Sequence, residues 1–329
     1  MAEDKPVGPA ELVLASSVAR RYYLDGRTKI EIGDEFQLSR FKVARLLETA
    51  HSQGLVKIEI SQPGSVNLEL SERLRDAFDL RHAVVIDADE NHEESLRQQL
   101  GRTAAELLTE ITTRNDVLGL TWARAVGAMA THLRSLPTIP VVQLTGAMSR
   151  SSGTANAADE ESSIDVVREV ARIARGPAYL FYAPLLVHDA ATARAMRQQP
   201  EVARALQQIA FVTKAVAGIG YWQAGLSTVY DTASARDRQS LTRQGVCADV
   251  GGVFLAADGT PLQTSLTDRM IGIDATQMLA IDQVLAIPYG LRKQPAVLAA
   301  VRSGMINSIV THASLASALL SDAGSGPSA

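Results

Sequence analysis

The sequence has little cysteine and no long apolar run. One cysteine, Cys247, stands among the 329 residues, which excludes an intrachain disulfide framework and a zinc site with several thiolate ligands. A run of about 18 apolar residues, as a membrane span requires, is missing. Residues 1–9 are polar and contain proline, so they lack the apolar segment of a secretory signal. We therefore expect a cytoplasmic protein with no membrane partner.

The common catalytic and cofactor motifs are missing as well. The histidines fall in no metal-binding or catalytic pattern, and neither a Gly-x-Ser-x-Gly elbow nor a phosphate loop ending in Gly-Lys-Ser/Thr is present. Gly218-Ile219-Gly220 is too short for a dinucleotide site. We expect no catalytic residue, no metal site and no cofactor. A phosphosugar-processing enzyme of isomerase or deaminase type stays open as the alternative, with Asp249 and Lys293 as its acid/base pair.

The chain contains enough apolar residues to build a large core. Hydrophobic residues make up 46% of it, and its length is typical of two domains. The formal net charge of -4 does not exclude DNA binding, because only the charge of the contacting face matters. A turn-rich segment, Gln62-Pro63-Gly64-Ser65, marks a boundary. We predict a DNA-binding domain at 1–60, a linker at 61–65, an effector-binding domain at 66–321 and a disordered tail at 322–329.

Three helices are predicted near the N-terminus. Apolar positions spaced by three or four residues indicate a helix over Ala10–Leu24. Thr28 and Glu31 form a capping box at the start of a second helix. The chain then turns at Gln37-Leu38, and Ser39 is suited to cap a third helix.

This arrangement is typical of a helix-turn-helix whose third helix enters the major groove. Residues 55–60 alternate apolar and polar side chains, which predicts the strand of a wing. Basic side chains suit phosphates and guanine edges, and hydroxyls at helix starts suit phosphate oxygens. The predicted DNA-binding residues are Thr28, Ser39, Arg40, Phe41, Lys42 and Arg45. The alternative is a helical bundle that docks a protein through a solvated polar face.

Beyond residue 66, short apolar runs alternate with helical stretches. Strands are predicted at Ala83–Ile86, Val117–Leu120, Val141–Leu144, Ala178–Phe181, Val212–Ala217, Val250–Leu255, Val284–Ile287 and Ser308–Val310. Helices are predicted between them, among them Glu93–Ile111 and Ala190–Leu206, the latter with a break at Pro200. This alternation predicts an α/β fold with a mostly parallel, doubly wound sheet. Such sheets bind ligands outside the carboxyl ends of their strands.

Several segments together resemble the SorC family of sugar-responsive bacterial regulators. Residues 32–47 resemble the family's helix-turn-helix, and residues 54–60 resemble its exit strand. Loops similar to those of the family follow in order at 119–125, 141–147, 218–220, 289–293 and 299–307. The resemblance spans nearly the whole chain. It implies a winged helix-turn-helix joined to a Rossmann-like effector domain related in fold to phosphosugar isomerases.

The resemblance also implies a function. It points to a repressor of a carbohydrate or polyol catabolic operon that binds operator DNA as a homodimer or homotetramer, and that a sugar, polyol or sugar phosphate releases. Lys293 would supply a cation for a phosphate or carboxylate, and Asp249 would bind ligand hydroxyls. The effector-binding residues expected from the resemblance and from the strand ends are Thr121, Trp122, Ala123, Arg124, Gln143, Thr145, Gly146, Asp249 and Lys293.

Some positions depart from the family pattern. Ala123 and Ala125 stand where a glycine and a hydroxyl residue are expected, which removes donors from a phosphate cradle. Ile287-Pro288-Tyr289-Gly290 replaces an alanine-glycine-glycine run, and Thr311-His312-Ala313 replaces a threonine-aspartate-glutamate run. Arg124 is a candidate substitute partner for an anion, and an unphosphorylated sugar or polyol stays open as the effector.

Overall fold

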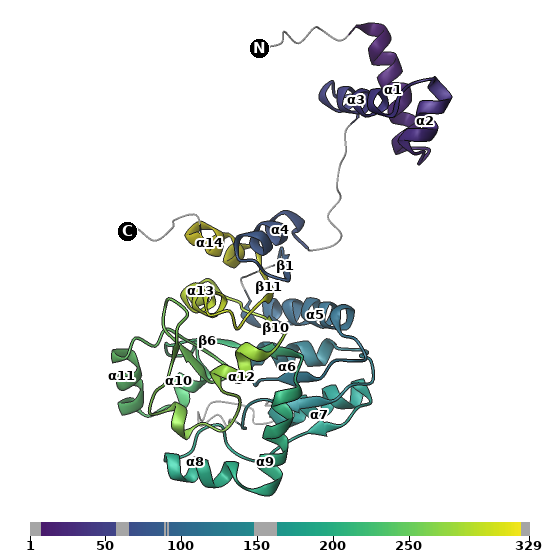
Figure 1. Ribbon diagram of the computed structural model, residues 1–329. Coiled ribbons are helices and arrows are strands. Elements are labelled where there is room, and N and C mark those ends of the chain that lie inside the picture. Colours follow the sequence, from purple (N-terminus) through teal and green to yellow (C-terminus); the bar gives the residue numbers. More distant parts are fainter. Residues whose placement is uncertain (1–7, 57–65, 89, 91, 148–162, 324–329) are drawn as a thin grey trace. The chain divides into compact units, whose positions relative to one another are not determined.

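The computed structural model describes residues 8–56, 66–88, 90, 92–147 and 163–323. The chain forms two compact units, Met1–Ser61 and Gln62–Ala329 (Figure 1). The division falls at the segment predicted as a linker, which itself lies outside the described residues. Among the residues described, none of the helices combines the length and apolar character that a membrane span requires.

Three helices make up the described part of the first unit. They are α1 (Pro9–Tyr23), α2 (Lys29–Phe36) and α3 (Arg40–Ser52). Each helix contributes an apolar face to one small core, which consists of Ala15, Val18, Ala19, Ile32, Val43, Leu46, Leu47 and Ala50. The stripe predicted on the third helix is therefore confirmed as the buried one.

Side-chain caps fix where the second and third helices begin. The Thr28 hydroxyl accepts a hydrogen bond from the Glu31 N–H, and the Glu31 carboxylate accepts one from the Thr28 N–H, as the predicted capping box requires. The Ser39 hydroxyl accepts the Lys42 N–H at 3.2 Å. These caps satisfy backbone donors that the first turns would otherwise leave unpaired.

The turn between α2 and α3 is tight. Gln37 takes a left-handed conformation with φ of 56°, and the Leu38 N–H donates to the Gly33 carbonyl at 2.7 Å. A Cβ atom on Gly33 would lie 2.7 Å from the Leu38 carbonyl oxygen, so only glycine allows this approach. Residues 57–60 of the predicted wing strand lie outside the described residues.

A seven-stranded sheet, with strands in the order β1-β11-β10-β5-β2-β3-β4, forms the frame of the second unit. Every neighbouring pair is parallel, which confirms the predicted α/β class. The strands are β1 (His82–Ile86), β2 (Leu118–Leu120), β3 (Val141–Gln143), β4 (Ala178–Tyr179), β5 (Lys214–Ala217), β10 (Gln283–Ala286) and β11 (Ser308–His312).

Helices cover both faces of this sheet (Figure 1). One face packs against α5 (Glu93–Ile111), α6 (Arg124–His132) and α7 (Ser163–Ala174), and the other against α4 (Leu68–Ala77), α13 (Gln294–Arg302) and α14 (Ala313–Ala323). On the central strands, Val216 and Leu285 belong to the core between the sheet and α5, α6 and α7. Their neighbours Ala215 and Val284 belong to the core between the sheet and α4, α13 and α14. This alternation is the period of two expected for strands buried on both faces.

The second unit also contains a small antiparallel sheet that the sequence did not predict. Its strands are β6 (Ile219–Tyr221), β7 (Ala248–Val250), β8 (Val253–Leu255) and β9 (Pro261–Leu262). The single strand predicted at Val250–Leu255 is wrong, because Gly251 and Gly252 have φ of 55° and 88° and turn the chain between β7 and β8. The predicted loop at Gly218-Ile219-Gly220 belongs in part to β6.

Most of the predicted helices are observed, and the remaining elements are short. The predicted break at Pro200 is confirmed, because it separates α8 (Ala190–Arg197) from α9 (Pro200–Gln207). The tail predicted from residue 322 starts too early, since α14 extends to Ala323. The other helices are α10 (Thr228–Thr232), α11 (Ala235–Arg243), α12 (Ala275–Ala280) and the 3-10 helices η1 (Gln208–Phe211), η2 (Thr267–Arg269) and η3 (Leu291–Lys293).

Candidate functional site

A cavity of about 410 Å³ opens at the carboxyl ends of the parallel strands. The segments after β2, β5 and β10 and the last residue of β11 line it. From β2 the chain proceeds to β3 and β4, and from β5 it proceeds the other way to β10 and β11. The neighbouring strands β2 and β5 therefore mark the switch point at which open α/β sheets bind ligands. The volume lies in the range of small-molecule sites.

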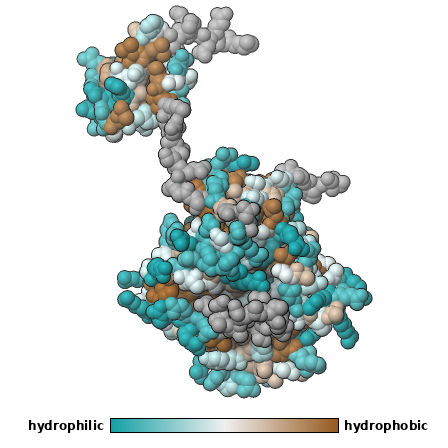
Figure 2. All heavy atoms as spheres, turned by 180° about the vertical axis from the view of Figure 1, so that it is seen from behind, coloured by the Kyte–Doolittle hydropathy of each residue, from teal (hydrophilic) through white to brown (hydrophobic). Residues whose placement is uncertain are grey.

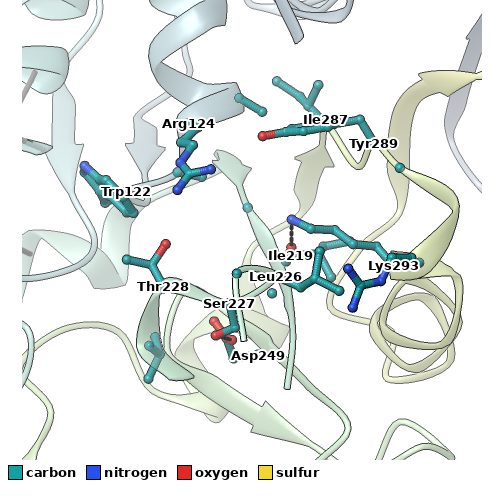
Figure 3. A pocket seen from close by; sticks show the side chains of 18 of the residues that line it. Trp122, Arg124, Ile219, Leu226, Ser227, Thr228, Asp249, Ile287, Tyr289 and Lys293 are labelled. Carbon is teal, nitrogen blue, oxygen red and sulfur yellow. Dashed lines mark hydrogen bonds between the residues drawn. The ribbon is translucent and has the colours of Figure 1, made fainter. Parts of the chain in front are cut away.

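Most of the residues predicted to bind an effector meet at this cavity, from four separate parts of the chain. They are Trp122, Ala123, Arg124, Thr145, Asp249 and Lys293. Figure 3 shows Trp122 and Arg124 on one side, and Asp249 and Lys293 on elements far along the chain. Thr145 also positions the first segment, because its hydroxyl accepts a hydrogen bond from the Trp122 N–H at 3.0 Å.

The structure does not bring Thr121, Gln143 and Gly146 to the cavity lining. The Thr121 hydroxyl accepts the Gly218 N–H at 3.1 Å, which ties β2 to the end of β5. The Gln143 amide donates to the Thr145 carbonyl and accepts the Phe181 N–H, so both of its ends are used internally. Gly146 packs so closely on backbone that an added Cβ would lie 2.6 Å from a neighbouring nitrogen. These predicted contact residues instead support the loops around the cavity.

Two basic side chains, Arg124 and Lys293, line the cavity. Arg124 begins α6, whose N-cap residue Ala123 provides no side-chain cap for the first-turn N–H groups. The Lys293 ammonium donates to the Ile219 carbonyl at 3.0 Å and lies 5.3 Å from the centre of the Tyr289 ring. Burial lowers the pKa of Lys293, Asp249 opposes this, and the nearby Arg124 guanidinium lowers the pKa further. The two cations and the helix start together suit an anionic group.

The cavity also contains a fixed carboxyl group. The Asp249 carboxylate, on β7, accepts the Ser227 hydroxyl at 2.6 Å. Burial raises the pKa of Asp249, while the Ser227 hydrogen bond and the Lys293 charge lower it less. A Cβ on Gly220 would lie 2.2 Å from this carboxylate, so glycine makes room for it. A buried, oriented carboxyl group of this kind binds ligand hydroxyls well.

Replacement of Asp249 by asparagine should stabilise the fold at neutral and alkaline pH. Since the folded pKa of Asp249 lies above its unfolded value, ionisation of the native state costs stability as pH rises through that window. Asparagine removes this cost and can still accept the Ser227 hydroxyl. Thermal unfolding should be measured from about pH 4 to about pH 8. The unfolding midpoint of the variant should rise relative to that of the parent as pH increases. A difference that is constant or reversed across this range would contradict the account.

A histidine and a glutamate that are not among the predicted effector contacts also line the cavity. The His312 Nδ1 lies 2.7 Å from a Glu90 carboxylate oxygen, and the Gly290 N–H donates to His312 Nε2 at 3.0 Å. Because Nε2 accepts, the ring proton sits on Nδ1 and is donated to Glu90. Ser314 donates to the same carboxylate. Burial alone would raise the pKa of Glu90, but the hydrogen bonds from Ser314 and His312 hold it below its usual value.

This network joins segments that are distant in the sequence. His312 ends β11, Glu90 follows β1, and Gly290 precedes the short helix that carries Lys293. The one sign of this network in the sequence is that Thr311-His312-Ala313 departs from the threonine-aspartate-glutamate run of the family pattern. The network holds the loop that brings Tyr289 and Lys293 to the cavity.

Replacement of His312 by leucine should loosen this loop. It removes the acceptor of the Gly290 N–H and the donor to Glu90, and each unsatisfied group costs about 1–3 kcal/mol. Urea unfolding of the full chain should show the loss. The matched control is His188→Leu, because the His188 side chain is 97% exposed and should contribute little. Equal stabilities for the two variants would show that the network does not hold the loop.

The rest of the wall combines apolar and polar side chains that the sequence analysis did not single out as ligand contacts. Beyond Trp122 and Tyr289, the cavity contacts Leu185, Leu226, Ile287, Glu93, Thr228, Asp231 and Arg292. The lining therefore combines apolar side chains with many charged and polar ones. Among the residues that the structure describes, no group of three or more metal-binding side chains comes together.

The first unit presents a second candidate surface on α3. Its exposed residues Arg40 and Arg45 have side chains directed away from the apolar core. Lys42 differs, because its ammonium lies 3.1 Å from the Glu11 carboxylate of α1. Thr28 and Ser39 act as helix caps. Apolar side chains also reach the surface of this unit in several places (brown in Figure 2).

Comparison with known proteins gives consistent matches along most of the chain. A family model described as "Putative sugar-binding domain" matches residues 63–321. The transcriptional regulator LsrR of Klebsiella pneumoniae subsp. pneumoniae is 26% identical over 318 residues, covering 94% of this chain and 94% of LsrR. The uncharacterized transcriptional regulator YjhU of Escherichia coli K12 is 23% identical over 311 residues, covering 91% of this chain and 92% of YjhU.

Solved structures show the same fold. The full-length sorbitol operon regulator SorC from Klebsiella pneumoniae aligns with a TM-score of 0.71 at 22% identity, covering 94% of this chain and 99% of SorC. A sugar-binding domain of a transcriptional repressor from Vibrio fischeri aligns with a TM-score of 0.68 at 22% identity, covering 78% of this chain and all of that domain. The α/β architecture around the cavity is therefore shared with these proteins.

Proposed function

Because this chain belongs to the sugar-binding domain family, we propose that it is a DNA-binding transcriptional regulator whose DNA affinity a small sugar-like effector controls. The observation that carries the proposal is the cavity at the switch point of the sheet, which is lined by the basic residues Arg124 and Lys293 and by the buried carboxyl group of Asp249. The predicted resemblance to SorC-type regulators is confirmed by the family match and by the relatives.

The N-terminal unit supports the DNA-binding part of the proposal. Two helices, a tight turn and a third helix with exposed arginines have the features of a helix-turn-helix. Arg40 and Arg45 lie in the first two turns of α3, the part that reaches base edges and phosphates in such motifs. Ser39 keeps the helix start in place. Lys42 contributes chiefly through its ion pair with Glu11.

The cavity supports an effector that carries both an anionic group and hydroxyls. Arg124, Lys293 and the first turn of α6 suit a phosphate or carboxylate. Asp249, held by the Ser227 hydroxyl, suits a hydroxyl of the ligand. We therefore favour a sugar phosphate or a sugar acid over a neutral polyol. In the same proposal, the chain is a cytoplasmic homo-oligomer that represses a carbohydrate operon and that the effector releases from DNA.

A ligand screen with the full chain tests this assignment. Thermal unfolding would be followed with sugars, polyols, sugar acids and sugar phosphates, all added at the same high concentration. A ligand that binds the folded chain raises the unfolding midpoint when its concentration exceeds its dissociation constant. We expect one anionic class to raise the midpoint and its neutral counterpart to have little effect. If only a neutral polyol stabilises the chain, the effector does not need Arg124 and Lys293 as partners for an anionic group. Turnover of a phosphosugar, without any DNA binding, would favour the enzyme alternative.

A further inference from the structure

An aromatic side chain stands out on the third helix of the first unit. Phe41 is the second residue of α3, and 87% of it is exposed. The buried residues of α3 are Val43, Leu46, Leu47 and Ala50, so the helical period places Phe41 at the middle of the opposite face. Phe41 therefore adds nothing to the core of this unit, although leaving such a side chain in water is unfavourable.

The neighbours of Phe41 indicate what covers it. Arg40 precedes it and Arg45 lies one turn further on, and both are exposed. Lys42 is turned aside to Glu11, so the part of this face nearest the helix start consists of an aromatic ring between two arginines. A face with two cations and one apolar ring complements DNA, which presents phosphates and base edges together.

We propose that Phe41 contacts the 5-methyl group of a thymine in the major groove and so contributes to the sequence specificity of this chain. This inference rests on the proposed DNA-binding function. The thymine methyl is the one apolar group that a base pair presents in the major groove, and phenylalanine is among the side chains that contact it. The N-terminal residues of a recognition helix are the ones that reach base edges, and Phe41 occupies that position.

The chemistry predicts a defined pattern of base preference. Arg40 and Arg45 suit guanine edges and phosphates, and neither can distinguish thymine from uracil. Phe41 can, because uracil differs from thymine only by the absence of the methyl group. Deoxyuridine at the contacted position should therefore weaken binding without altering any Watson–Crick pair.

The test uses the full chain and DNA that the chain itself selects from a random pool. Each thymine of the selected sequence is replaced singly by deoxyuridine, and affinity is measured by fluorescence anisotropy. One contacted methyl group should account for about a fourfold loss, the equivalent of roughly 0.8 kcal/mol. Phe41→Ala should bind the unmodified DNA roughly tenfold more weakly and should be insensitive to deoxyuridine at that position. Circular dichroism checks that the variant remains folded.

The matched control is Leu24→Ala. Leu24 is 76% exposed in the same unit but lies just after α1, outside the proposed contact face. This variant should retain the affinity and the deoxyuridine pattern of the parent. The proposal is overturned if Phe41→Ala keeps the parent's pattern, or if that variant changes only self-association in sedimentation. Selection of no sequence at all would instead contradict the proposed function itself.

Discussion

Replacing Lys293 by methionine should abolish the response to an anionic effector while DNA binding stays intact. The ammonium faces the cavity together with Arg124, and methionine keeps most of the aliphatic stem without the charge. Removing one partner of a buried charged contact costs about 2–5 kcal/mol, which corresponds to roughly 30-fold or greater loss of effector affinity. Titration calorimetry with the effector found in the screen measures this loss.

The fold should tolerate this change. Burial disfavours the charged form of Lys293, so its removal relieves a desolvation cost that partly offsets the lost hydrogen bond to Ile219. The matched control is Arg204→Met on α9, an exposed basic residue outside the cavity lining. If Lys293→Met binds the effector as tightly as the parent does, then either the ligand binds outside this cavity or its anionic group does not contact Lys293.

Simultaneous replacement of Arg40 and Arg45 by alanine should remove specific DNA binding. A base-edge contact by arginine contributes about 1–3 kcal/mol, so the pair should lower affinity by roughly a hundredfold or more. The dependence of affinity on salt should also become less steep, because fewer counterions are released. Anisotropy titrations over a salt series measure both effects.

The control for this variant is Arg20→Ala. Arg20 is an exposed basic residue of α1 that lies outside the third helix, so its loss removes one positive charge from the same unit, against two in the α3 variant. It should change affinity little. If it weakens binding as much as the α3 variant, nonspecific charge rather than α3 governs the interaction, and the helix-turn-helix assignment is contradicted.

Local signals in the sequence predicted much of this fold. The capping box at Thr28 and the cap at Ser39 depend on neighbours within three residues, so their pattern is visible in the chain. The long helix Glu93–Ile111 was predicted with its observed bounds, because its apolar period continues over many turns. The parallel strands follow from short apolar runs separated by helices.

What the sequence did not predict depends on contacts between distant segments or on backbone conformation. The small antiparallel sheet was missed because the turn at Gly251-Gly252 lies inside an apolar run that suggests one strand. The His312–Glu90 contact joins residues 222 positions apart, so no spacing rule finds it. The end of a strand predicts a ligand contact at Gln143, although its amide bonds to the backbone of Thr145 and Phe181. Polar residues at strand ends serve either purpose, and only the three-dimensional arrangement separates them.

The central claim is that effector binding in the cavity changes the affinity of the same chain for DNA. The most direct test is a titration of the full chain onto its selected DNA, with and without the metabolite that stabilises it in the ligand screen. We predict that the metabolite weakens DNA binding at least tenfold for the parent and leaves Lys293→Met unaffected. Unchanged DNA affinity in the presence of a bound metabolite, or an equal change in both proteins, would contradict the claim.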